Sequence, residues 1–313
     1  MDSGELVVKG ILFNFAEQIV IMTEKELKDK NPWNDVAEMI KPDMKDCLFR
    51  EEDQEAFVCK DDKCIIDEFN KSFLKGSSPD RIITNTPPEP WRGNPLKANL
   101  IILSLNPGYT PEINETIAKL IQSNEHIRTL LANYRIKTLE LKVNSFLPED
   151  EKGDDPISCE EAEDMLSGWY WTKRLKNLQE ELEKERGISK TAFFRKVAVI
   201  EYHGYSSTTA AKGFPSKRLH SQVFTKELIK HIACRKDVVF LIMRSKDKWD
   251  KLMNYDSEGN IDSEGNNIWE NLEKKGKLIF REKHGRCQYV TNENLHNCNC
   301  GNGYEKIKEA LMR

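Results

Sequence analysis

Apolar and polar residues follow two different periods along this chain, and the changes between them outline the elements of a fold. Four short apolar runs have the length of buried strands. They lie at residues 99–105, 195–202, 237–243 and 277–282. Helical spacing of apolar residues predicts helices at 112–135, 158–186, 220–235 and 304–312. Strands that alternate with helices form a parallel sheet covered on both faces. The pattern therefore predicts a three-layer α/β/α fold around a central, mostly parallel, four-stranded sheet.

The first 75 residues have mostly a helical period. The stretches "WNDVAEMI" and "CIIDEFNKSFL" place apolar residues three and four positions apart. The segment Gly76-Ser77-Ser78-Pro79 then breaks the pattern, and a proline-rich stretch follows at 84–97. We therefore predict a mostly helical N-terminal region, 1–78, packed on an α/β domain, 79–313. Farther along, residues 255–267 repeat Ser-Glu-Gly-Asn, which predicts a flexible polar insertion.

Composition narrows the class of protein. Hydrophobic residues make up 38% and charged residues 32% of the chain, and no apolar run approaches the ~20 residues that span a bilayer. The apolar stretch near the start lacks a basic leader and a small-residue cleavage site, so it does not resemble a signal peptide. We expect a cytoplasmic protein with reduced cysteines and no membrane partner.

The cysteines indicate no metal site or cofactor. Cys59 and Cys64 are five positions apart, and Cys298 and Cys300 are two apart. Neither pair has the spacing typical of zinc ligands, so we expect scattered thiols. An iron–sulfur cluster stays open as an alternative.

The net charge of −4 conceals an asymmetry. Residues 1–185 carry a net charge of −13, with 24 basic and 37 acidic side chains, whereas residues 186–313 carry +9, with 24 and 15. The basic half favours a surface that faces phosphate, and the acidic half needs no explanation beyond solvation.

Ligands of parallel sheets bind outside the carboxyl ends of the strands, so four loops are candidates for a site. They lie at 106–110, 201–209, 244–249 and 284–295. The first contains Asn106-Pro107-Gly108-Tyr109, in which proline and glycine favour a tight turn that fixes the amide. An amide both donates and accepts, so it can orient a water or read a base edge. The alternative is an ordinary turn whose asparagine bonds to its own backbone.

The stretch "LIILSLNPGY" resembles the first active-site motif of the uracil-DNA glycosylase superfamily, particularly its mismatch-specific and thymine-glycosylase branches. The resemblance implies a parallel sheet between helical layers and is specific over about ten residues. It also implies that Asn106 positions the attacking water. The resemblance matches Gly108 to a position where strict uracil enzymes carry a tyrosine, and it implies that a glycine there leaves room beside C5 of a pyrimidine. Tyr109 next to it offers an aromatic face for the base.

The second loop contains Glu201, Tyr202 and His203, near the place where this family often uses an asparagine to read the base. A carboxylate or imidazole there can stabilise an oxocarbenium ion or activate water. The alternative for His203 is a loop histidine bonded to the backbone. In the third loop we predict phosphate contacts for Arg244 and Ser245, and packing for Trp249.

The fourth loop lacks the family's second motif, which is a His or Asn followed by Pro and Ser. Its available polar residues are His284, Arg286, Gln288 and Asn292. Elsewhere, "SGWYWTKRLKNL" (167–178) places aromatic beside basic residues, a combination that can stack bases and hold phosphates. On a helix Trp169, Tyr170 and Trp171 point in different directions, so at least one of them should lie in the core. We favour a core role for most of them over base stacking.

Together the residues and the resemblance predict an enzyme similar to DNA glycosylases that hydrolyses the N-glycosidic bond of a flipped-out, modified or mismatched pyrimidine. DNA is the predicted partner. Two alternatives stay open: a catalytically inactive nucleic-acid-binding module of the same fold, and an enzyme that processes free nucleosides or nucleotides.

Overall fold

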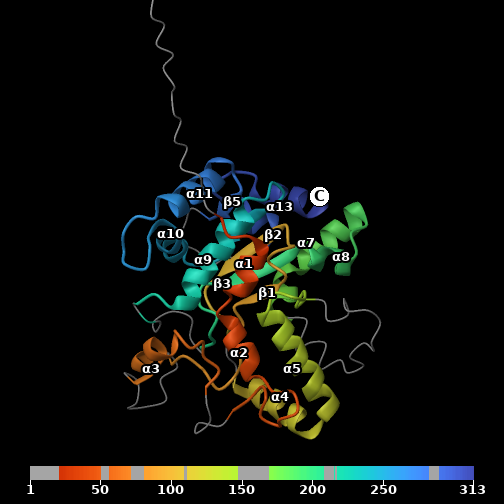
Figure 1. Cartoon of the computed structure of the whole chain (residues 1–313). Coiled ribbons are helices and arrows are strands. Elements are labelled where there is room, and N and C mark those ends of the chain that lie inside the picture. The colour runs from red at the N-terminus through yellow and green to blue at the C-terminus, as the bar shows by residue number, and fades with distance from the viewer. Residues whose placement is uncertain are drawn as a thin grey trace, which may run out of the picture.

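The protein is an α/β structure built on a mixed, mostly parallel sheet flanked by helices (Figure 1). The computed structural model describes residues 21–50, 56–71, 81–108, 111–146, 169–207, 215, 217–281 and 289–313. Within them the sheet has five strands in the order β1-β3-β2-β4-β5. The strands are β1 (Trp91–Gly93), β2 (Leu100–Ser104), β3 (Val197–Glu201), β4 (Val239–Ile242) and β5 (Leu278–Phe280).

The sheet confirms the four predicted strands and adds a fifth. Strands β2 to β5 are parallel neighbours, with β2 between β3 and β4, whereas β1 pairs antiparallel with β3. The predicted count of four was therefore wrong. Strand β1 has only three residues and lies in the proline-rich stretch, where a short edge strand tolerates a neighbouring proline because one side needs no partner.

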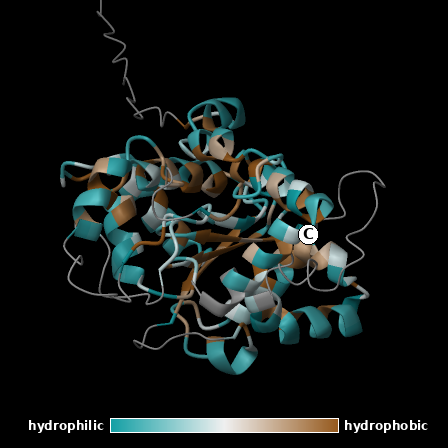
Figure 2. Ribbon diagram, turned by 90° about the horizontal axis from the view of Figure 1, so that it is seen from below, coloured by the Kyte–Doolittle hydropathy of each residue, from teal (hydrophilic) through white to brown (hydrophobic). Residues whose placement is uncertain are grey.

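Both faces of the sheet are buried, which explains why its central strands are continuously apolar. Ile101 and Leu103 of β2 face the cluster that includes Leu228 of α9 (His220–Ala233). Leu100 and Ile102 face the cluster that includes Leu175 of α7 (Trp169–Arg186). Figure 2 shows the apolar residues gathered on the strands, with polar residues outside them.

The remaining helices surround this core. They are α1 (Glu24–Asp29), α2 (Trp33–Met39), α3 (Lys63–Lys71), α4 (Pro111–Ser123), α5 (Glu125–Leu139), α8 (Lys190–Arg195), α10 (Lys246–Asn254), α11 (Ser263–Lys274), α12 (Asn292–Leu295) and α13 (Gly303–Met312). None of the described helices is both long enough and apolar enough to cross a membrane.

The structure changes one predicted helix, 112–135, and describes only part of another, 158–186. The single helix predicted at 112–135 is two helices, because Asn124 ends α4 and caps α5 by accepting from the Ile127 N–H. Helix α7 ends at Arg186 as predicted, and Gly187 follows with φ +67°. The beginning predicted for it, 158–168, lies outside the described residues.

The N-terminal helices share the core of the sheet. Leu27, Trp33 and Val36 belong to the same buried cluster as Ile101. The buried Asp62 accepts a hydrogen bond of 2.8 Å from the Tyr205 hydroxyl. The predicted boundary at residue 78 lies outside the described residues.

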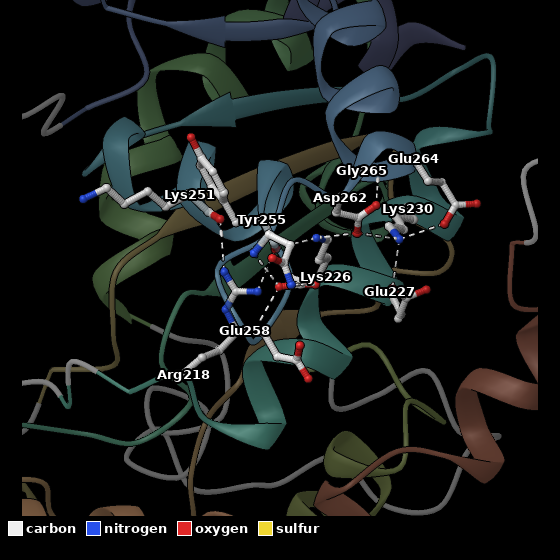
Figure 3. Close-up of polar contacts among 12 residues, drawn as sticks. Arg218, Lys226, Glu227, Lys230, Lys251, Tyr255, Glu258, Asp262, Glu264 and Gly265 are labelled. Carbon is white, nitrogen blue, oxygen red and sulfur yellow. Dashed lines mark hydrogen bonds and ion pairs between the residues drawn. The ribbon is translucent and has the colours of Figure 1, made fainter.

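The predicted flexible insertion at 255–267 is ordered and contains the start of α11. Tyr255 and Ile261 form a β-bridge, and the Asp262 carboxylate caps α11 by accepting from the Gly265 N–H at 2.9 Å. Asp262 also binds the buried Lys226 and Lys230 of α9 (Figure 3). The many polar residues here form a turn and a helix cap, not a loose loop.

Candidate functional site at the strand ends

The first two candidate loops lie side by side beyond the carboxyl ends of β2 and β3. The Tyr202 N–H donates to the Ser104 carbonyl at 3.2 Å, and the His203 N–H to the Leu105 carbonyl at 2.9 Å. Farther out, Gly108 and Ser207 form a parallel bridge. The backbone pairing of the strands thus continues into the loops and holds residues 105–108 against 202–207.

Asn106 lies at the centre of this junction, partly buried. Its Nδ2 donates to the Ser207 hydroxyl at 3.0 Å and to the Pro107 carbonyl at 2.9 Å. Its Oδ1 is buried and accepts no hydrogen bond from the described residues. The amide is therefore fixed through its nitrogen while its acceptor stays unused, which is an expensive state for a buried polar atom. Ser207, which the sequence did not single out, is the residue that holds the amide.

Gly108 faces open space. A Cβ built on it would meet no described atom within 4 Å, and the residue is exposed, whereas Pro107 is buried. Tyr109, predicted to offer an aromatic face, lies outside the described residues.

Glu201 ends β3 directly opposite Ser104 of β2. Burial raises the pKa of this carboxyl to about 8, and the negative charge of Glu89 acts in the same direction. A hydrogen bond with Ser104 and the charge of Arg244 oppose the shift. Its Oε2 accepts no hydrogen bond within the described part of the chain. At neutral pH Glu201 is therefore a buried neutral acid, not the carboxylate that we predicted as one option.

Glu89 belongs to an ion-pair group that the sequence did not reveal. Its carboxylate accepts from Arg92 at 2.7 Å and from Arg135. Although burial acts against ionisation, Arg135 and Arg92 hold the pKa of Glu89 well below its usual range. The site thus contains two carboxyl groups in opposite states, Glu89 ionised and Glu201 neutral.

His203 and Tyr202 are packed rather than open to a ligand. His203 is 2% exposed, and its ring meets that of Tyr202 edge-on at 4.7 Å. Burial, with a smaller effect of Lys248, lowers the pKa of His203 well below its usual value, so the imidazole is neutral at pH 7. Tyr202 in turn packs against Trp249, which is fully buried as predicted. The geometry favours a structural role for His203.

The third loop contributes Arg244 and Ser245 at the carboxyl end of β4. Arg244 donates from Nη2 to the Tyr170 hydroxyl at 3.2 Å. Ser245 has φ 54° and ψ 54°, and its hydroxyl forms no capping bond with α10. In the fourth loop, Asn292 is exposed at the start of α12, and His284, Arg286 and Gln288 lie outside the described residues.

The cysteines form no metal centre within the ranges that the structure describes, where no group of three or more His, Cys, Asp or Glu side chains could hold an ion. Cys298 and Cys300 approach each other to 3.6 Å between sulfur atoms, and Cys64 is exposed.

No family model, no curated protein and no solved structure matches the chain. The resemblance to uracil-DNA glycosylases therefore rests on the Asn-Pro-Gly stretch and stays a prediction.

Proposed function

We propose that this protein hydrolyses the N-glycosidic bond of a pyrimidine base that has been turned out of DNA, on a fold related to the uracil-DNA glycosylases. The observation that carries the proposal is the state of Asn106. Its Nδ2 is held by Ser207 and by the Pro107 carbonyl, and its buried Oδ1 has no donor among the described residues. Because this oxygen is closed to solvent, the loops must open for a water to reach it, and the bound water then gains the fixed orientation that hydrolysis of a glycosidic bond requires.

The chemistry divides between two residues. Asn106 accepts a hydrogen bond from the water that attacks C1′, while the bond between C1′ and the base breaks through an oxocarbenium-like state. The electron pair of that bond leaves with the base, and the neutral acid Glu201 donates the proton that the base takes up. The proton lost by the attacking water restores Glu201. A pKa of about 8 keeps this acid protonated at neutral pH.

Gly108 gives the proposed site its range of substrates. Because nothing described lies within 4 Å of a Cβ at this position, the site can admit a pyrimidine with a group on C5. We therefore expect thymine in mismatches, or C5-modified cytosine, to be released as well as uracil.

The test uses the full chain and oligonucleotides that contain uracil, a G·T mismatch or a C5-modified cytosine, with alkali-labile abasic sites as the readout. Asn106→Ala is expected to lower the rate at least about 100-fold. Asn267→Ala, an exposed asparagine on α11, is the matched control and should leave the rate unchanged.

Three results would overturn the proposal. They are no release of any base, release of bases only from free nucleosides, and salt-dependent DNA binding without an abasic product. The last would favour a non-catalytic binding module.

A further inference from the structure

Two tyrosines and two arginines gather beside the end of β4 and form what we call the tyrosine–arginine patch: Tyr170, Arg174, Arg244 and Tyr289. The Arg174 guanidinium carbon lies 4.0 Å from the centre of the Tyr170 ring and 5.7 Å from that of Tyr289. Arg244 reaches the same tyrosine through its 3.2 Å hydrogen bond to the Tyr170 hydroxyl. Residues from α7, from the end of β4 and from the segment before α12 thus meet at one place.

The two tyrosines of the patch are exposed, whereas its two arginines are partly buried. Tyr170 is 42% and Tyr289 38% exposed, which places both among the few large exposed apolar side chains described in the chain. The neighbouring Trp171 is buried and meets the Tyr170 ring edge-on at 5.2 Å. The Val290 N–H donates to the Arg174 carbonyl at 3.1 Å and so ties the Tyr289 segment to α7. The predicted core role therefore holds for Trp171 and not for Tyr170.

The composition of the patch indicates its partner. Aromatic faces and guanidinium planes stack on nucleobases, and the same arginines bind phosphate. Bases in a duplex are already stacked on each other, whereas unpaired bases have free faces for the tyrosines. The patch borders the end of β4, and β4 is the strand next to β2, whose carboxyl end leads to Asn106.

We propose that the tyrosine–arginine patch binds the single-stranded DNA beside the extruded nucleotide, with bases stacked on Tyr170 and Tyr289 and phosphates held by Arg174 and Arg244. This inference rests on the proposed function for its biological setting, but its test needs no catalysis. Stacking tolerates any base, so the contact should show little sequence preference.

The experiment measures binding of a fluorescent oligothymidine without a target base, and of a hairpin duplex of equal length, by anisotropy at two salt concentrations. Tyr170→Ala and Tyr289→Ala should each weaken binding to the single strand about 10-fold. Tyr170→Phe, which keeps the ring and loses the hydroxyl, should retain most of the affinity. Arg174→Ala should also reduce the salt dependence of binding, because fewer phosphates are neutralised.

Matched controls exist elsewhere in the chain. Tyr255 is 41% exposed on the turn before α11, and Arg186 is exposed in the last turn of α7. Tyr255→Ala and Arg186→Ala should bind oligothymidine as the unaltered protein does. Circular dichroism and the melting temperature establish that each variant is folded.

Several outcomes would overturn the inference: no binding of oligothymidine by the unaltered protein, equal binding by folded patch variants, or the same loss for the hairpin and for the single strand. Failure of base release with weakened binding in the patch variants would reject the proposed enzyme and leave the patch supported. Base release by the unaltered protein together with undiminished binding by the variants would support the proposed enzyme and reject the patch.

Discussion

Two groups of polar side chains lie inside this protein and differ in how completely they are paired. On α9, the Lys230 ammonium lies 2.8 Å from Glu264, 3.1 Å from Glu227 and 3.2 Å from Asp262 (Figure 3). At the strand ends, Asn106 and Glu201 each keep a buried oxygen that accepts no hydrogen bond from the described residues. Lys230 and Glu201 are similarly inaccessible, at 4% and 6% exposure, so burial alone does not distinguish the two groups.

The two groups differ in whether their buried polar atoms can still bind a ligand. A buried charge whose partners surround it has its desolvation offset by those partners, and it holds α9 to α11. A buried acceptor without a donor costs free energy, and such atoms in native proteins call for an explanation such as a bound water or a catalytic role. We therefore assign the lysine network to stability and propose a functional role for the strand ends.

The largest expected loss of stability comes from removing Lys230 from its network of carboxylates. Lys230→Met should lower the free energy of unfolding by about 3 kcal/mol, because Glu227 and Glu264 lose this cation, although Asp262 keeps Lys226. Urea unfolding followed by circular dichroism measures the change. Lys274→Met is the control, since Lys274 and Glu270 form an exposed pair with side chains 71% and 52% accessible. It should change stability by less than about 0.5 kcal/mol. Equal effects of the two variants would contradict the assignment.

One glycine beside each group, Gly265 and Gly108, tests how tightly the surrounding residues are packed. A Cβ on Gly265, in the first turn of α11, would lie 2.2 Å from the Met253 carbonyl oxygen and 3.0 Å from Lys226 Cε. Gly265→Ala should therefore destabilise the protein by about 2 kcal/mol through overpacking. Gly108→Ala should stay within about 0.5 kcal/mol, since its Cβ meets nothing described within 4 Å. A large loss of thermal stability in Gly108→Ala would show that the space beside Asn106 is filled.

Glu201 of the strand ends and Asp262 of the lysine network should affect stability in opposite ways as the pH changes. Burial raises the Glu201 pKa from 4.5 to about 8, so its contribution to stability is present below pH 4.5 and is lost as pH rises toward 8. Burial opposes ionisation of Asp262, yet the Gly265 N–H and Lys226 lower its pKa to about 2, so its contribution is present above pH 3.8 and lost as pH falls through 2.

Replacing each carboxyl by its amide tests the direction of both pH effects on stability. Between pH 5 and 8, the stability of Glu201→Gln relative to the unaltered protein should increase by about 1.4 kcal/mol for each pH unit. Asp262→Asn should be less stable by about 2 kcal/mol with no slope over the same range. Unfolding in urea at four pH values measures both differences. A flat Glu201→Gln difference would mean that this carboxyl is ionised in the folded protein.

The sequence predicted the buried strands because a strand covered on both faces must be apolar at every position. Residues 99–105 and 237–243 contain β2 and β4 for that reason. It missed β1, whose three residues pair with β3 only through tertiary contact. It also missed α11, in which Gly265 and many polar residues suggested a loop, although Ile268, Trp269 and Leu272 supply a buried face.

The sequence predicted only some of the residues of the candidate site. The rule that parallel strands present their carboxyl ends together selected Asn106 and Glu201, and the structure brings their loops into contact. The partners that decide their states could not be predicted. Ser207 lies 101 positions from Asn106 in sequence, and Arg135 lies 46 positions from Glu89. Nothing in local spacing distinguishes such residues from other loop and helix residues.

Asn106→Ala should change stability less than the substitutions of Lys230 and Gly265 do. The variant loses two hydrogen bonds made by Nδ2, each worth about 1 kcal/mol, but it also removes a buried Oδ1 that accepts none from the described residues. These contributions oppose each other, so the free energy of unfolding should change by less than about 1 kcal/mol. Urea unfolding of the same preparation used for the base-release assay measures it. A large loss of stability would mean that the amide holds the two loops together and that any loss of base release reflects unfolding. A small loss with abolished base release is the combination that a water-positioning residue requires, because its unused acceptor serves the substrate complex and not the fold.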